Sequence, residues 1–144
     1  MNHKILRMCI WLAVAMFVDQ FATASNAPVV SGYYQVVQSK AVGSQKQIKV
    51  FIHLVNHGPI DLSIQRMTLW DFSHPDKGGT RVCALALHAH ATAETTQEFT
   101  IRRPEYESWR RGMRPRLVLE LMAPSRAKST AVVRLDRISS QEAR

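Results

Sequence analysis

The sequence from Gln47 to Leu69 reads QIKVFIHLVNHGPIDLSIQRMTL, and it predicts two β-strands joined by a turn. Apolar side chains recur at every second position from Ile48 to Leu54. Such alternation is typical of a strand that buries one face and leaves the other in contact with solvent. The run Asn56-His57-Gly58-Pro59 then has the composition of a turn. We therefore expect β-structure to dominate this part of the chain.

The second strand of the pair changes phase. Residues Ile60–Ile64 alternate as before, but Met67 and Leu69 lie one position out of step. A β-bulge near Gln65 and Arg66, or a strand that moves to another sheet there, explains the slip, because one extra residue reverses the faces of all that follow.

The rest of the chain repeats the period of two at regular spacing. About seven strands are expected in total, separated by turn residues such as those of His74–Gly79 and Ala123–Lys128. Pro104–Arg114 is expected to hold one helical turn. The pattern predicts an all-β fold of two packed sheets. The further strands are expected at Tyr33–Gln38, Arg81–Leu87, Thr95–Ile101, Leu117–Leu121 and Ala131–Leu135.

Residues 1–24 have the organisation of a secretory signal peptide. Lys4 and Arg7 precede an apolar run from Cys9 to Val18, and Ala22-Thr23-Ala24 supplies a small-residue cleavage signature. The run is shorter than the roughly 20 residues that span a bilayer, although retention as an anchor is an alternative. We therefore expect a periplasmic or secreted protein with no transmembrane segment after cleavage.

Length and charge limit the domain count and the kind of partner expected for the chain after residue 24. The 144 residues carry a formal net charge of +8, which removal of residues 1–24 lowers by one, and this balance favours anionic partners. One β-sandwich domain is expected at 32–138, after a flexible entry at 25–31 and before a polar tail at 139–144. Cys83 is the only cysteine after the predicted cleavage site, which excludes a disulfide scaffold within one chain.

The segment Arg102–Arg116 reads RRPEYESWRRGMRPR and gathers six arginines around two aromatic residues. Arginine makes bidentate contacts with phosphate and carboxylate groups, and aromatic rings stack on ligands. The segment is therefore a candidate docking loop for an envelope protein, a glycan or lipid headgroups, whereas nucleic acid is not expected as a partner of an exported protein. Alternatively, it connects two strands, and its aromatic rings fill one end of the sandwich. The candidate residues are Arg102, Arg103, Tyr106, Trp109, Arg110, Arg111, Arg114 and Arg116.

Histidines form a second candidate site. His88 and His90 are two residues apart, so on a strand they would share one face and offer two imidazoles to copper or zinc. His53 and His57 are the candidates that would complete such a site. Cys83 falls on the opposite face of the same strand and is expected to be buried and inert. Alternatively, these histidines lie at the surface without a metal.

Catalytic motifs are missing from the sequence. It contains no nucleophile elbow, phosphate-binding loop or zinc-protease helix motif, and its acidic residues are scattered. We therefore expect no enzyme activity and no cofactor, with copper or zinc as the cofactor only in the metal-binding alternative.

Parts of this sequence resemble two known protein families. The strand–turn–strand unit Lys49–Leu69 and the hairpin Leu117–Leu135 resemble those of bacterial immunoglobulin-like β-sandwich domains, which implies a binding or spacer module in the envelope. The exported copper chaperones, also small β-sandwiches, are similar in having a strand followed by Asn-His-Gly, as at residues 56–58 here. Their copper site has a His-x-Met pair, which this chain lacks. A non-catalytic binding module of the bacterial envelope is therefore the first hypothesis, and a periplasmic metal carrier is the alternative.

Overall fold

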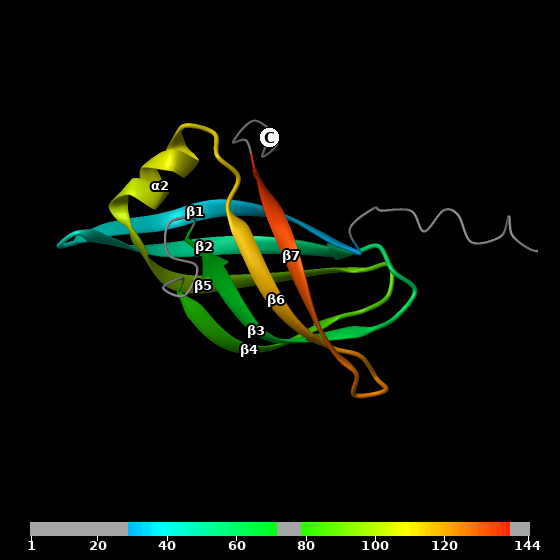
Figure 1. Cartoon of the computed structure of the whole chain (residues 1–144). Coiled ribbons are helices and arrows are strands. Elements are labelled where there is room, and N and C mark those ends of the chain that lie inside the picture. Colours follow the sequence, from blue (N-terminus) through cyan, green and yellow to red (C-terminus); the bar gives the residue numbers. More distant parts are fainter. Residues whose placement is uncertain (1–28, 72–78, 139–144) are drawn as a thin grey trace, which may run out of the picture.

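The computed structural model describes residues 29–71 and 79–138 of the chain. Seven strands and one helix occur in these residues, which confirms the predicted all-β class (Figure 1). The predicted signal peptide, polar tail and most of the loop at 74–79 lie outside the described residues. The elements are β1 (Val30–Val42), β2 (Gln45–Asn56), β3 (Leu62–Trp70), β4 (Thr80–Leu87), β5 (Thr92–Arg102), α2 (Arg103–Arg110), β6 (Arg116–Met122) and β7 (Lys128–Arg137).

β1 extends further than the sequence predicts. It begins at Val30, inside the segment 25–31 that is expected to be a flexible entry, and it continues to Val42. Residues 25–28 lie outside the described part of the chain. Its start is held by the turn after β2, because His57 N donates a 2.8 Å hydrogen bond to the carbonyl oxygen of Val29.

The seven strands form one sheet with the order β4-β3-β6-β7-β1-β2-β5. The sequence predicts two separate sheets, but a short parallel pairing of β1 with β7 joins the two halves, whereas the other neighbours pair antiparallel. Gly32 lies opposite Leu135 in the parallel pairing. A Cβ atom on Gly32 would lie 2.8 Å from side-chain atoms of both Leu135 and Leu54, so any larger residue there would make these two leucine side chains move.

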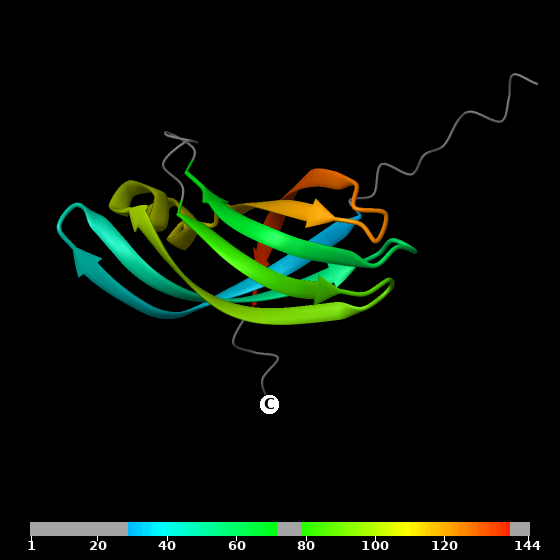
Figure 2. The ribbon, with the colours of Figure 1, turned by 90° about the horizontal axis from the view of Figure 1, so that it is seen from below.

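The sheet curls until its edge strands, β4 and β5, lie side by side (Figures 1 and 2). Arg81 of β4 supports this approach by donating a hydrogen bond from Nε to the carbonyl oxygen of Glu98 in β5. The core lies inside the curl and is filled by the apolar faces of the strands. The four alternating apolar residues from Ile48 to Leu54 are at most 2 % exposed, which confirms the predicted inward face of β2.

β3 contains the predicted irregularity. Its register shifts between Ile64 and Arg66 in the pairing with β4 and also in the pairing with β6. Ile64 and Met67 are both fully buried although they are three residues apart. The extra residue therefore restores the apolar face to the core, and the predicted bulge is confirmed.

α2 connects β5 to β6 and covers one end of the curled sheet (Figure 1). It is longer than the single helical turn predicted from the sequence, with eight residues from Arg103 to Arg110. Pro104 stands in its first turn, where the missing N–H costs no helical hydrogen bond. Nowhere in the described residues is there a helix with the length and apolar character needed to cross a membrane.

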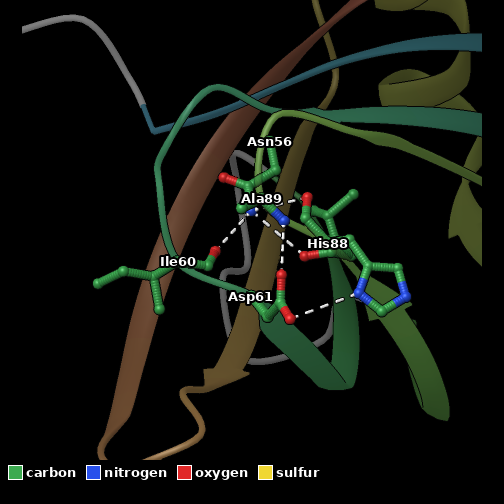
Figure 3. A network of polar contacts seen from close by, with 6 residues as sticks. Asn56, Ile60, Asp61, His88 and Ala89 are labelled. Atoms are coloured by element: carbon green, nitrogen blue, oxygen red, sulfur yellow. Dashed lines mark hydrogen bonds and ion pairs between the residues drawn. The ribbon is translucent and has the colours of Figure 1, made fainter.

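Asn56 organises the opposite end of the molecule (Figure 3). This buried side chain donates from Nδ2 to the carbonyl oxygens of Ile60, Leu87 and His88 at 2.8, 3.2 and 3.1 Å. Its Oδ1 accepts a 2.9 Å hydrogen bond from the backbone N–H of Gly58. One amide group therefore joins the turn after β2 to the turn after β4.

Candidate functional site

The aromatic residues of the Arg102–Arg116 segment attach α2 to the core. Trp109 is 3 % exposed, and its ring packs edge-on against Tyr34 with the ring centroids 6.0 Å apart. Tyr106 is half-buried, and Lys46 Nζ lies 5.0 Å from the centroid of its ring. Trp109 therefore fills one end of the sheet and presents no ring face for a partner to stack on.

Two of the candidate arginines are bound to the body of the domain. Arg102 holds buried Asp71 with two hydrogen bonds of 2.6 Å, from Nε to Oδ2 and from Nη2 to Oδ1. The hydrogen bond to Asp71 raises the pKa of Arg102. Arg116 of β6 is half-buried, with its guanidinium carbon 5.4 Å from the centroid of the Trp70 ring. These two side chains stabilise the end of the sheet rather than face a partner.

The other four arginines are exposed, and we call Arg103, Arg110, Arg111 and Arg114 the arginine face. The first three stand on α2 and its C-cap at spacings of seven and eight residues, which places them on one side of a helix. Arg114 follows after the turn. Within residues 29–71 and 79–138, no carboxylate lies at ion-pair distance from Arg103 or Arg111.

The remaining two members of the face have exposed acidic neighbours. Arg110 Nη1 lies 3.4 Å from Glu107 Oε2, and Arg114 Nε lies 3.0 Å from Asp136 Oδ1. Pairs in which both partners are solvated contribute at most about 1 kcal/mol. Arg110 and Arg114 are therefore held weakly and can exchange these contacts for an external anion.

A hollow of about 170 Å³ lies between the C-terminal end of α2 and the end of β7. Tyr34 and Trp109, each 3 % exposed, form its floor. The exposed side chains of Arg110, Arg114 and Arg137 line its rim. The hollow is thus aromatic at its base and cationic at its mouth.

Sequence reasoning missed Tyr34 and Arg137 as part of this site. The two residues are direct partners in the parallel pairing of β1 with β7. Ile138 N also donates a 2.9 Å hydrogen bond to the carbonyl oxygen of Tyr34. No local pattern signals a pairing between the first and last strands, so only the fold brings these side chains together.

The histidines do not form the predicted strand pair. β4 ends at Leu87, so His88 and His90 lie in the following turn, where His90 has a positive φ of 53°. Hydrogen bonds from Asn56 to the carbonyl oxygens of Leu87 and His88 hold this turn away from a strand conformation. The prediction that His88 and His90 share a strand face is therefore wrong.

Three of the described histidines make a polar side-chain contact, each with one neighbour. His53 Nδ1 lies 2.9 Å from Glu94 Oε1, and His57 Nε2 lies 2.7 Å from the Ser31 hydroxyl. His88 Nδ1 lies 3.6 Å from an oxygen of Asp61. In the part of the chain that the structure describes, no three His, Cys, Asp or Glu side chains come together as a metal site.

The pKa of Asp61 is lowered and the pKa of Cys83 is raised from their ordinary values. The Ala89 backbone N–H donates a 2.8 Å hydrogen bond to Asp61 Oδ1, and this bond, with smaller help from His88, lowers the pKa of Asp61 (Figure 3). Cys83 packs against the core, but it is half-buried and not fully buried as the sequence predicts, and this burial raises the pKa of its thiol. A protonated thiol at neutral pH is a poor nucleophile and a poor metal ligand.

Comparison with known proteins gives no family for this chain. No family model matches the sequence, and no curated protein matches it. The chain is remotely similar to several solved structures, two of which follow. The X-ray structure of the Northeast Structural Genomics Consortium target SoR45 is 8 % identical with a TM-score of 0.47, over 80 % of this chain and 90 % of that chain. The crystal structure of a protein from Archaeoglobus fulgidus is 11 % identical with a TM-score of 0.36, over 72 % and 87 % of the two chains.

Proposed function

We propose that this chain is a non-catalytic binding module, exported to the bacterial envelope, that docks on an anionic partner through the arginine face. One observation carries the proposal: four exposed arginines lie on α2 and just after it, and among the described residues two have no ion-pair partner while the other two are weakly paired. Arginine is suited to this role because its planar guanidinium gives two parallel hydrogen bonds to a phosphate, sulfate or carboxylate group. The partner is an envelope protein, a glycan or a lipid headgroup.

Rigid placement of α2 supports docking. The helix is attached by Trp109 at its C-terminal end and by the Arg102–Asp71 ion pair just before its first residue. A binding surface on a fixed element loses less conformational entropy when a partner orders it than a surface on a loose loop.

Export and the fold type are parts of the same proposal. The signal-peptide signature of residues 1–24 supports export. An immunoglobulin-like sandwich is supported by the strand order, in which β1, β2 and β5 are neighbours in one half and β4, β3, β6 and β7 in the other. Such domains serve as binding modules, in line with the proposed role.

The test measures binding to immobilised heparin and to vesicles that contain anionic phosphatidylglycerol, at increasing salt. Binding should weaken with salt, because exposed charges are screened. Arg103→Gln/Arg111→Gln should weaken it further without lowering the melting temperature, since neither side chain has an ion-pair partner in the described chain.

The matched control is Arg126→Gln/Lys128→Gln, which removes the same charge from the β6–β7 turn and the first residue of β7, at the other end of the molecule (Figure 1). Arg126 already adopts a positive φ of 64°, so replacing its side chain with that of glutamine introduces no new backbone strain. Equal losses in both double variants would show that net charge alone drives binding, and the docking surface would then be wrong.

A further inference from the structure

The hollow beside α2 has the shape and size of a subsite for one chemical group. Its volume of about 170 Å³ lies below the roughly 300–1,000 Å³ of pockets that enclose whole small-molecule ligands. Its lining includes Arg110 and Arg114 on one side and the end of β7 on the other. A group presented by a larger partner can enter it while the arginine face contacts the rest of that partner.

The charges around the hollow are unbalanced. Arg110, Arg114 and Arg137 line it, whereas Asp136 is the one carboxylate among its lining residues. Asp136 is engaged by Arg114 at 3.0 Å. Among the described residues, no carboxylate lies at ion-pair distance from Arg137. Two positive charges at the hollow therefore lack a strong partner.

Tyr34 supplies a neutral donor at the base. The side chain is 97 % buried, and its hydroxyl has no hydrogen-bond partner in residues 29–71 and 79–138. Burial raises the pKa of Tyr34, and the charge of Arg137 opposes this rise only partly. The phenol thus keeps its proton at neutral pH. The hydroxyl is not among the buried polar atoms of the described residues that lack a partner, so it is open to solvent and can donate to an oxyanion bound in the hollow.

We propose that this hollow binds one tetrahedral oxyanion, a phosphate monoester or a sulfate group, between Arg110, Arg137 and the Tyr34 hydroxyl. Arg114, which pairs weakly with Asp136, lies at the edge of the site. A carboxylate offers two oxygens, whereas a tetrahedral oxyanion offers three to donors that converge from several elements. The inference rests on the proposed function and names the group that the anionic partner inserts.

The experiment titrates inorganic phosphate and sulfate into the protein and follows the amide and arginine Nε–Hε signals by NMR, with sodium chloride at equal ionic strength as the reference. Saturable shifts at Arg110 and Arg137 are expected. Arg137→Gln should weaken phosphate binding by roughly tenfold, as the loss of a charged hydrogen bond implies. Tyr34→Phe should weaken it several-fold and leave the melting temperature unchanged, because the hydroxyl has no partner to lose.

Arg111→Gln is the matched control, since Arg111 belongs to the arginine face but does not line the hollow. It should leave the phosphate and sulfate titrations unchanged and still reduce binding to heparin or vesicles. Shifts that chloride reproduces, or that survive both Tyr34→Phe and Arg137→Gln, would overturn the oxyanion site while docking stands.

A second arm distinguishes the source of the group. Vesicles that carry phosphatidic acid present a phosphate monoester, and heparin presents sulfate. If Tyr34→Phe weakens binding to the vesicles, the group is a lipid phosphate, and if it weakens binding to heparin, the group is a glycan sulfate. If it changes neither, the hollow takes no part in docking and the inference fails. The proposed function fails separately, if Arg103→Gln/Arg111→Gln has no effect or an effect no larger than that of Arg126→Gln/Lys128→Gln.

Discussion

Trp109 and Glu105 are joined inside α2 by a 3.0 Å hydrogen bond from the indole Nε1 to the carboxylate Oε1, and both residues are buried. The carboxylate satisfies an indole N–H that would otherwise be buried without an acceptor. Because Arg110 follows Trp109 directly, this pair also fixes the place from which the arginine face projects. The same contact therefore serves packing and the presentation of charge.

Replacing Trp109 tests this anchor. Trp109→Ala should lower the free energy of unfolding by about 3–5 kcal/mol, as expected for a large buried ring that leaves a cavity. Urea denaturation followed by circular dichroism measures the loss. Glu105→Gln is the matched variant, because its amide oxygen can still accept from the indole, and its loss should be much smaller. Similar losses in the two variants would mean that burial of Trp109 contributes little.

The pattern of the strands could be predicted because it is local. The inward face of β2 and the bulge before Arg66 both follow from which positions are apolar, and burial of these positions imposes the same register in three dimensions. The joining of the halves into one sheet could not be predicted, since it depends on the close approach of Gly32 to Leu135.

The site was less predictable because its contacts are distant in sequence. Alternation at residues 88–91 continues the pattern of a strand, yet Asn56 and Asp61 bind the backbone there and produce a turn. Similarly, the pattern around Arg102 does not reveal that Asp71 engages it. Composition thus located the arginine-rich segment, while tertiary contacts decided which of its arginines remain exposed.

Asn56 should be the most sensitive polar residue at the end opposite α2. Asn56→Ala removes the donor to three carbonyl oxygens and the acceptor for Gly58 N–H, so we expect a loss of at least about 2 kcal/mol in the free energy of unfolding. Chemical denaturation measures it. The control is Gln97→Ala, whose amide makes one contact, with Thr95. A loss no larger than that of the control would contradict the role of Asn56 in joining the turns.

Asp61 should make the protein sensitive to acid. Its pKa is lower in the folded protein than the ordinary value of 3.8, chiefly because the Ala89 N–H donates to its carboxylate. The unfolded chain therefore takes up the proton first as the pH falls. The stabilisation is complete above the ordinary carboxyl pKa and disappears as the pH drops through the lower folded value.

Asp61→Asn provides the comparison, since its amide oxygen can still accept from Ala89 but never carries charge. The urea midpoint of this variant, measured between about pH 6 and pH 2, should fall less steeply with acid than that of the parent protein. Parallel curves for the two proteins would show that other carboxylates control the acid response.

Metal titration separates the docking module from the metal carrier. The described histidines offer pairs such as His53 with Glu94 and His88 with Asp61, whereas zinc sites use three or four protein ligands. A ligand that binds only the native state raises the melting temperature, and the rise grows with its concentration relative to its Kd. We therefore expect no saturable rise with Cu(I), Cu(II) or Zn(II). A rise that disappears in His88→Ala/His90→Ala would instead make the carrier the leading function, because loss of metal binding on removing these imidazoles would place the ion in the turn after β4.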